Sequence, residues 1–225
     1  MQTKTSMGAA VRQDWPVLVL IPVSLLAGLL VYPHLPARIP VHWNVVGQPD
    51  RLASPLEAVL GLPLLTVVIY GLLVWAPLID PRRANYERFG GTMRLLRRAL
   101  VVMMVATQWM ALGPALGLPI APGGAARLMV GVVFVVIGNV LGQVKPTFFV
   151  GIRTPWTLSD DRVWQHTHRL AGRLWVAAGL VAILTGFLPD TAGAIVMGVA
   201  LGFSVLYPTV FSYLDFRRLH NGEGS

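Results

Sequence analysis

Residues 137–175 read IGNVLGQVKPTFFVGIRTPWTLSDDRVWQHTHRLAGRLW, a polar and aromatic stretch in a chain that is otherwise mostly apolar. The stretch is too long and too chemically varied to be a simple turn. Apolar runs long enough to cross a bilayer lie around it, so this connector is predicted to lie at a membrane surface. There its arginines, tryptophans and histidines can meet lipid headgroups or a partner. Function should therefore be sought in the connectors.

The composition indicates a membrane protein with a single domain. Of the 225 residues, 55% are hydrophobic and 12% are charged, which is too apolar for a soluble domain. The formal charge of +8 arises from arginines at the ends of apolar runs, so it indicates membrane topology and no direct contact with nucleic acid. The chain has no cysteine, which excludes a disulfide, a thiolate metal site and a thiol nucleophile.

Six apolar runs are candidate transmembrane helices, and we expect an all-α polytopic domain that covers residues 1–225. The first run is short, but Trp15 and Tyr32 can place its two ends at the interfaces, and no cleavage signal follows it, so we expect it to be retained. The runs cover residues 17–32, 56–79, 95–118, 128–144, 170–188 and 192–214.

Lysine and arginine are distributed unevenly between alternate connectors. With the N-terminus in the cytoplasm, only Arg38, Arg51 and Arg127 of the 18 lysines and arginines fall on the outside. A reading with five or seven helices would scramble this division. We therefore predict six spans with both termini cytoplasmic.

The first outside connector reads LPARIPVHWNVVGQPD over residues 35–50. Its prolines hold the chain extended, so residues 41–44 are a candidate short strand and residues 47–50 a candidate turn. The connector is expected to form an ordered cap on the outer surface.

A metal site in this cap is the alternative interpretation. His42 and Asp50, with His34 nearby, are possible ligands, but their spacing matches no familiar metal motif. An ordered cap with hydrogen bonds through His42, Asn44 and Asp50 is the stronger expectation.

The inside connector is expected to begin where Lys145 and Pro146 end the fourth helix. Residues 151–156 look irregular, and residues 157–160 (TLSD) resemble a capping box that opens the next helix. That helix is expected to lie along the inner leaflet before it turns into the fifth span.

Two histidines of this connector are unsuited to one metal ion. His166 and His168 differ by two positions, which on a helix is about 200°. His168 shares a helix face with Trp164 and Trp175, so we expect a partly buried, hydrogen-bonded imidazole there rather than a ligand or a proton sensor.

The predicted spans carry few polar side chains, among them Gln108, Asn139 and Gln143, and no Asp, Glu, Lys or Arg deep in a span. Ion-coupled pumps usually need such charges, so a proton-driven transporter is not favoured. No residue pattern suits an intramembrane hydrolase. We expect neither an enzyme nor a cofactor.

Small residues recur in the last two spans, where they favour close helix contact. Gly179 and Gly186 lie in the fifth span, and Gly193, Gly198 and Gly202 lie in the sixth. Packing is the simpler interpretation of this pattern.

The two connectors resemble the SdpI family of bacterial membrane proteins, with a DUF1648 segment in the N-terminal part. On this resemblance, residues 1–80 form the DUF1648-like part with its external cap 35–50, and residues 128–215 form the SdpI-like part with its cytoplasmic connector 145–173. Thr147 departs from the family, which tends to carry Asn there. The matching residues are His42, Trp43, Asn44, Gly47, Pro49 and Asp50 outside, and Asn139, Gly142, Lys145, Pro146, Gly151, Arg153, Thr154, Pro155, Trp156, Ser159, Trp164, His168, Arg169 and Gly172 inside.

The resemblance implies a multi-pass immunity protein of the bacterial inner membrane that protects against a secreted peptide toxin. It also implies a signalling role in which a cytoplasmic transcriptional repressor is drawn to the membrane. The matching outside residues would then bind toxin, and the inside ones a partner or anionic lipids. The alternatives are a small-molecule or lipid transporter or channel built around kinks at Pro63, Pro114 and Pro208, and a membrane enzyme with an unrecognised metal site.

Overall fold

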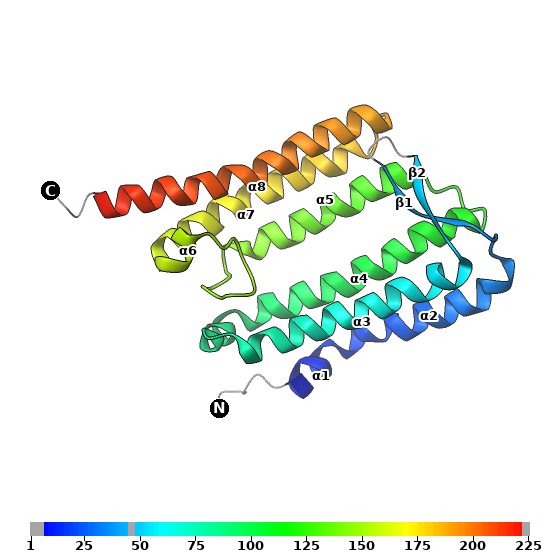
Figure 1. Cartoon of the computed structure of the whole chain (residues 1–225), viewed down its shortest axis with the longest axis horizontal. Helices are drawn as coiled ribbons and strands as arrows, with labels where there is room; N and C mark the ends of the chain where they lie inside the picture. Colours follow the sequence, from blue (N-terminus) through cyan, green and yellow to red (C-terminus); the bar gives the residue numbers. More distant parts are fainter. Residues whose placement is uncertain (1–6, 45–47, 222–225) are drawn as a thin grey trace.

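The computed structural model describes residues 7–44 and 48–221. Long helices run side by side, and a two-stranded hairpin caps one end of the bundle (Figure 1). The helical class is confirmed, although the hairpin means that the chain is not purely helical. The elements are α1 Met7–Leu18, α2 Leu20–Val31, η1 Tyr32–His34, β1 Ile39–Trp43, β2 Pro49–Ala53, α3 Pro55–Ile79, η2 Arg83–Phe89, α4 Gly90–Ala115, α5 Pro122–Leu141, α6 Pro155–Ser159, α7 Asp161–Thr185 and α8 Asp190–Asn221.

Four helical segments are long and apolar enough to cross a membrane: α3, α4 together with η2, α5 and α8. Helices α1 and α2 form a fifth if this pair, bent by 41°, is one span. The bend follows from Pro22, whose ring clashes with the carbonyl of Leu18 one turn earlier. Helix α7 is long enough to cross a membrane, but Arg162, Arg169 and Arg173 make its first half too polar for α7 to count among these apolar segments. The sixth span therefore stays a prediction.

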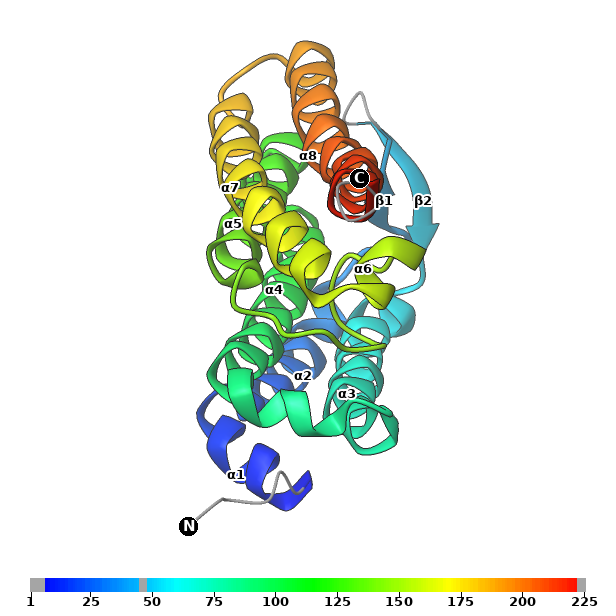
Figure 2. The same ribbon diagram turned by 90° about the vertical axis from the view of Figure 1, so that its left-hand side faces the viewer.

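The helices form two groups. Helices α5, α7 and α8 lie on one side of the molecule, and α2, α3 and α4 lie on the other, in both Figure 1 and Figure 2. The hairpin lies at one end of the long axis, and α6 and the connector between α5 and α7 lie at the other (Figure 1).

Glycines spaced seven residues apart bring α5 and α7 into backbone contact. A Cβ atom on Gly131 would lie 2.6 Å from the carbonyl oxygen of Gly179, and one on Gly138 would lie 2.8 Å from that of Gly172. Two turns closer to the start of α5, a Cβ on Gly124 would lie 2.9 Å from the carbonyl oxygen of Gly186. Such contacts leave no room for any side chain, so these glycines set the distance between the two helices.

The glycine pattern of the last two spans was therefore interpreted only partly correctly. Gly179 and Gly186 do mediate close helix contact, both with α5. Gly193 packs against Thr185 and Arg127, whereas an added Cβ on Gly198 or Gly202 would meet no described atom within 4 Å.

Charged side chains are buried at several places near the ends of the helices. The first is Asp14, whose side chain is fully buried between α1, α3 and α4. Its carboxylate accepts hydrogen bonds from Arg97 Nε at 2.7 Å, Arg98 Nε at 2.9 Å and the Tyr70 hydroxyl at 3.1 Å. The pairing offsets the cost of burial, so this cluster joins α1 to the bundle.

The second is Arg127, which was expected in an outside loop. Helix α5 begins at Pro122 rather than at residue 128, so Arg127 lies within it and is buried. Its guanidinium donates to the carbonyls of Thr185 and Leu188, both at 3.0 Å, and to the carboxylate of Asp190 at 2.8 Å. The carbonyls that end α7 have no partner within that helix, so Arg127 caps α7 and ties it to α5.

Candidate functional site

The hairpin of β1 and β2 is held to the bundle by a buried side chain of β1. Ile39 of β1 is fully buried in a cluster with Ala58, Val59 and Leu112, so the hairpin rests on α3 and α4. Strand β1 pairs antiparallel with β2, with irregular register after Pro40. This anchoring gives the exposed residues of the hairpin a fixed position.

The hydrogen bonds expected in this cap are present, but its turn was misplaced. His42 Nδ1 lies 2.5 Å from Asp50 Oδ1, and both side chains are exposed. The side chain of Asn44 accepts a bond from the backbone N–H of Gln48 at 3.0 Å. Pro49 and Asp50 belong to β2, which the sequence analysis missed, rather than to a turn. Trp43 is half-buried, and Gly47 lies outside the described residues.

At the other end, Asp80 organises the connector between α5 and α7. Its carboxylate is buried and accepts hydrogen bonds from the N–H of Arg82 at 2.7 Å, the Tyr86 hydroxyl at 2.8 Å and the N–H of Phe148 at 2.9 Å. Three donors thus satisfy the oxygens of this buried carboxylate. Asp80 therefore fastens the end of α3 to the connector of the other helix group.

Further bonds extend this junction. The side-chain amide of Asn85 donates to the carbonyl of Pro146 at 2.8 Å, and Arg82 donates to the carbonyl of Leu158 at 2.9 Å. Thr147, where the family tends to carry Asn, is fully buried and donates to the carbonyl of Val150 at 2.8 Å. A hydroxyl thus performs a structural role at this position.

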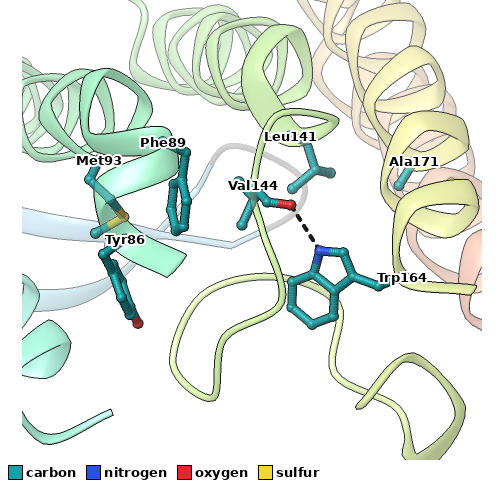
Figure 3. Packing of buried hydrophobic residues seen from close by; sticks show 7 residues of the cluster. All are labelled: Tyr86, Phe89, Met93, Leu141, Val144, Trp164 and Ala171. Atoms are coloured by element: carbon teal, nitrogen blue, oxygen red, sulfur yellow. Dashed lines mark hydrogen bonds between the residues drawn. The ribbon is translucent and has the colours of Figure 1, made fainter. Parts of the chain in front are cut away.

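An aromatic core lies under the connector. Trp164 is fully buried, and its indole N–H donates to the carbonyl of Val144 at 2.8 Å, drawn as the dashed line in Figure 3. Tyr86 and Phe89 from η2 lie opposite Trp164 in the same core (Figure 3). The ring centroids of Tyr86 and Phe89 are 5.3 Å apart. The core therefore joins residues that are far apart in the chain.

His168 is a neutral structural imidazole, as the sequence suggested, and it is fully rather than partly buried. It stacks on Trp164 with ring centroids 4.0 Å apart, and its Nε2 accepts the N–H of Ile152 at 2.9 Å. Nδ1 must then carry the proton, which it donates to the carbonyl of Trp164 at 2.8 Å. Burial lowers the pKa of His168 to about 4, with the Trp164 carbonyl partly opposing the shift.

Gly151 is required by this imidazole. Its φ of +123° disfavours any side chain, and a Cβ there would lie 2.5 Å from His168 Nε2. The presence of glycine at position 151, one of the residues that match the SdpI family, therefore has a steric explanation.

We expect acidification to loosen the connector. The imidazole of the unfolded chain gains a proton near its ordinary pKa of 6.5, whereas the folded one resists until about 4. Its contribution to stability is therefore complete above pH 6.5 and declines as the pH falls toward 4, by up to about 3 kcal/mol. Thermal unfolding in detergent between pH 7.5 and 4.5 measures this loss. His168→Gln should flatten the pH dependence in that window, His166→Gln should retain it, and equal curves for both variants would contradict the prediction.

The capping box lies three residues before the predicted one. Thr154 accepts the N–H of Thr157 at 3.2 Å, and the Thr157 hydroxyl accepts the N–H of Thr154 at 2.9 Å. This pair opens the short helix α6, while Asp160 caps α7 by accepting the N–H of Arg162 at 2.7 Å. Trp156 lies against Tyr213 of α8, with ring centroids 5.0 Å apart.

The predicted inside residues fall into two sets. Pro146, Gly151, Thr154, Trp156, Trp164 and His168 hold the connector together by contacts with its surroundings. The second set, which includes exposed and half-buried side chains on the surface, consists of Asn139, Lys145, Arg153, Pro155, Ser159 and Arg169. The second set is therefore the more accessible to a partner.

Four residues of this junction were not predicted, because they lie in and beside the short connector between α3 and α4: Asp80, Arg82, Asn85 and Tyr86. A lone carboxylate between the apolar end of a span and Pro81 was the available signal. Within the described residues, no group of three or more His, Cys, Asp or Glu side chains lies close enough to hold a metal ion.

Comparisons with known proteins place this geometry in context. Residues 143–212 match the SdpI/YfhL protein family, and residues 19–67 match a domain of unknown function, DUF1648. The immunity protein SdpI of Bacillus subtilis (strain 168) is 23% identical over 206 residues, which cover 92% of this chain and 97% of that protein. An uncharacterised membrane protein of the same organism, YbgB, is 29% identical over 83 residues, or 37% of this chain and 81% of its own. No solved structure matches the chain.

These matches confirm the resemblance to the SdpI family and its DUF1648 segment. Together with the long apolar helices, they make the chain a multi-pass protein of the bacterial cell membrane.

Proposed function

We propose that this chain, with its SdpI/YfhL and DUF1648 segments, is an immunity protein that protects a bacterium against a secreted peptide toxin. The observation that carries the proposal is the similarity, along nearly the whole chain, to a protein named as an immunity protein. The structure adds support, because the hairpin at one end of the bundle and the connector at the other (Figure 1) both carry exposed polar side chains, such as Asp50 and Arg153. A membrane receptor needs two such surfaces to relate an outside signal to an inside one.

In this proposal the membrane holds six spans, with both termini and the connector 145–173 in the cytoplasm and the hairpin outside. The alternating directions of α2, α3, α4, α5, α7 and α8 along the bundle support it (Figure 1). Helix α7 packs against both α5 and α8, through Gly179 and through the Trp175 indole, which donates to the carbonyl of Ser204. The arginine-rich first half of α7 would then reach the inner headgroups, and its second half would cross the membrane.

The proposed toxin surface is the exposed part of the hairpin, with His42 and Asp50 at its centre. The proposed cytoplasmic surface is the basic set Lys145, Arg153 and Arg169, which suits an acidic face of a repressor or anionic lipid headgroups. Both surfaces are outside the packed cores, so substitutions there should change binding without unfolding the protein.

Helix α3 offers a physical link between the two surfaces. It begins directly after β2, where Ser54 accepts the N–H of Glu57, and it ends at Asp80, which holds the N–H of Phe148. A toxin that binds one of two positions of the hairpin more tightly would shift the equilibrium between two positions of the connector. The size of that shift is limited by the difference between the two binding free energies.

Survival of toxin-treated cells tests the function. Cells that express the chain should survive a peptide toxin secreted by the producing strain, and Asp50→Arg should abolish protection while Arg38→Gln, in the same outer connector, should not. Arg153→Gln should leave protection intact and weaken recruitment of a repressor to membranes. Unchanged killing of cells that express the wild-type chain would overturn the proposal.

The orientation is checked separately with a membrane-impermeant maleimide, which the natural chain cannot bind because it has no cysteine. In intact cells Asp50→Cys should be labelled and Ser159→Cys should not, while both should react in opened membranes. Labelling of both in intact cells would contradict the proposed topology.

A further inference from the structure

An apolar groove runs between α4 and α5, where the two helix groups meet. Its volume is about 760 Å³. Alanines at positions 99, 106 and 125 leave space that larger side chains would fill. The outer end is bordered by Leu118 and Ile120 of the loop between the helices, and the opposite end by Arg98. The groove therefore has one apolar end and one cationic end.

We propose that this groove holds an acyl chain of an anionic phospholipid, with the phosphate beside Arg98 and Arg94. An open apolar groove within a bilayer fills with hydrocarbon, because an empty space would forfeit dispersion contacts on every wall. The proposal rests on the membrane location of the bundle and is independent of toxin immunity.

The length of the groove suits an acyl chain. The α4 residues that line it run from Leu95 to Met110, which is about 22 Å at 1.5 Å per residue. That is more than half of the hydrocarbon core, so one acyl chain that enters from one leaflet can follow the groove along its length.

The charge selects the headgroup and the leaflet. Arg94, Arg97 and Arg98 follow one another at the connector end of α4, and the carboxylate of Asp14 pairs with the last two. Arg94 lies one turn from Arg98 on the same helix face and adds a further positive charge at this end. A phosphate is thus attracted from the leaflet on the connector side, which is the cytoplasmic one in the proposed orientation.

Native mass spectrometry of the full chain in mild detergent tests the proposal with phosphatidylglycerol and phosphatidylethanolamine of identical acyl chains. One phosphatidylglycerol should be retained more tightly than phosphatidylethanolamine. Arg94→Gln should weaken the binding of phosphatidylglycerol about fivefold and leave the binding of phosphatidylethanolamine unchanged. Arg88→Gln, at an exposed arginine of η2, is the control of equal charge.

Filling the groove separates specific binding from general lipid adhesion. Ala106→Phe should remove the retained lipid of both kinds, whereas Ala177→Phe, at an exposed alanine of α7, should keep it. Thermal unfolding of each variant checks that the fold is intact. Equal retention of the two lipids by the wild type, or equal lipid retention by the two phenylalanine variants, would overturn the proposal, as would a protein dimer that Ala106→Phe disrupts.

Discussion

Gly131→Leu should leave little folded protein, because α5 and α7 can no longer approach each other. A Cβ at this position would lie 2.6 Å from the carbonyl oxygen of Gly179 and 2.8 Å from the backbone nitrogen of Ile183. Both obstacles are backbone atoms, so no side-chain rotation relieves the clash. The cost should reach about 3 kcal/mol or more, at the upper end of overpacking penalties. Size-exclusion chromatography and thermal unfolding in detergent measure the loss.

Gly198→Leu is the matched control. Gly198 lies on α8, where an added Cβ meets no described atom within 4 Å, so leucine should extend into lipid and leave the melting temperature nearly unchanged. If the two leucine variants melt alike, the glycine contacts do not determine how α5 and α7 pack.

Asp80→Ala should detach the connector from the end of α3. Two donors, the buried Tyr86 hydroxyl and the part-buried N–H of Phe148, would lose their acceptor, and the loss of a buried partner costs about 1 to 3 kcal/mol. We expect a total loss of about 3 kcal/mol in local stability, together with faster amide hydrogen exchange over residues 144–153. If α3 links the hairpin to the connector, signalling to the cytoplasm should fail as well.

Asp161→Ala provides the comparison. This exposed carboxylate pairs with Arg82 at 3.3 Å, and such surface pairs contribute at most about 1 kcal/mol. Hydrogen exchange over the connector should therefore stay close to that of the natural chain. Exchange that rises equally in both variants would show that charge, rather than the buried carboxylate, holds the connector.

The cap and the connector illustrate how far sequence reasoning reached. The hydrogen bonds of His42 and Asn44 and the buried face of His168 followed from local spacing and were found. The second strand was missed because Pro49 and Asp50 resemble turn residues. Its pairing with the first strand is also irregular, with register shifts between Pro40 and His42 and between His42 and Trp43. The capping box was misplaced because Thr154 and Thr157 form one as readily as the later residues do.

The sequence by itself determined that the chain is embedded in a membrane and mostly helical, because length and apolarity are properties of each segment alone. It also indicated two polar ends that differ in their arginine content. Only the tertiary structure decided which segments meet: the glycines of α5 with those of α7, Asp80 with Phe148, and Arg127 with the end of α7. These partners lie tens of residues apart, and their pairing depends on how whole helices pack, which no local pattern encodes.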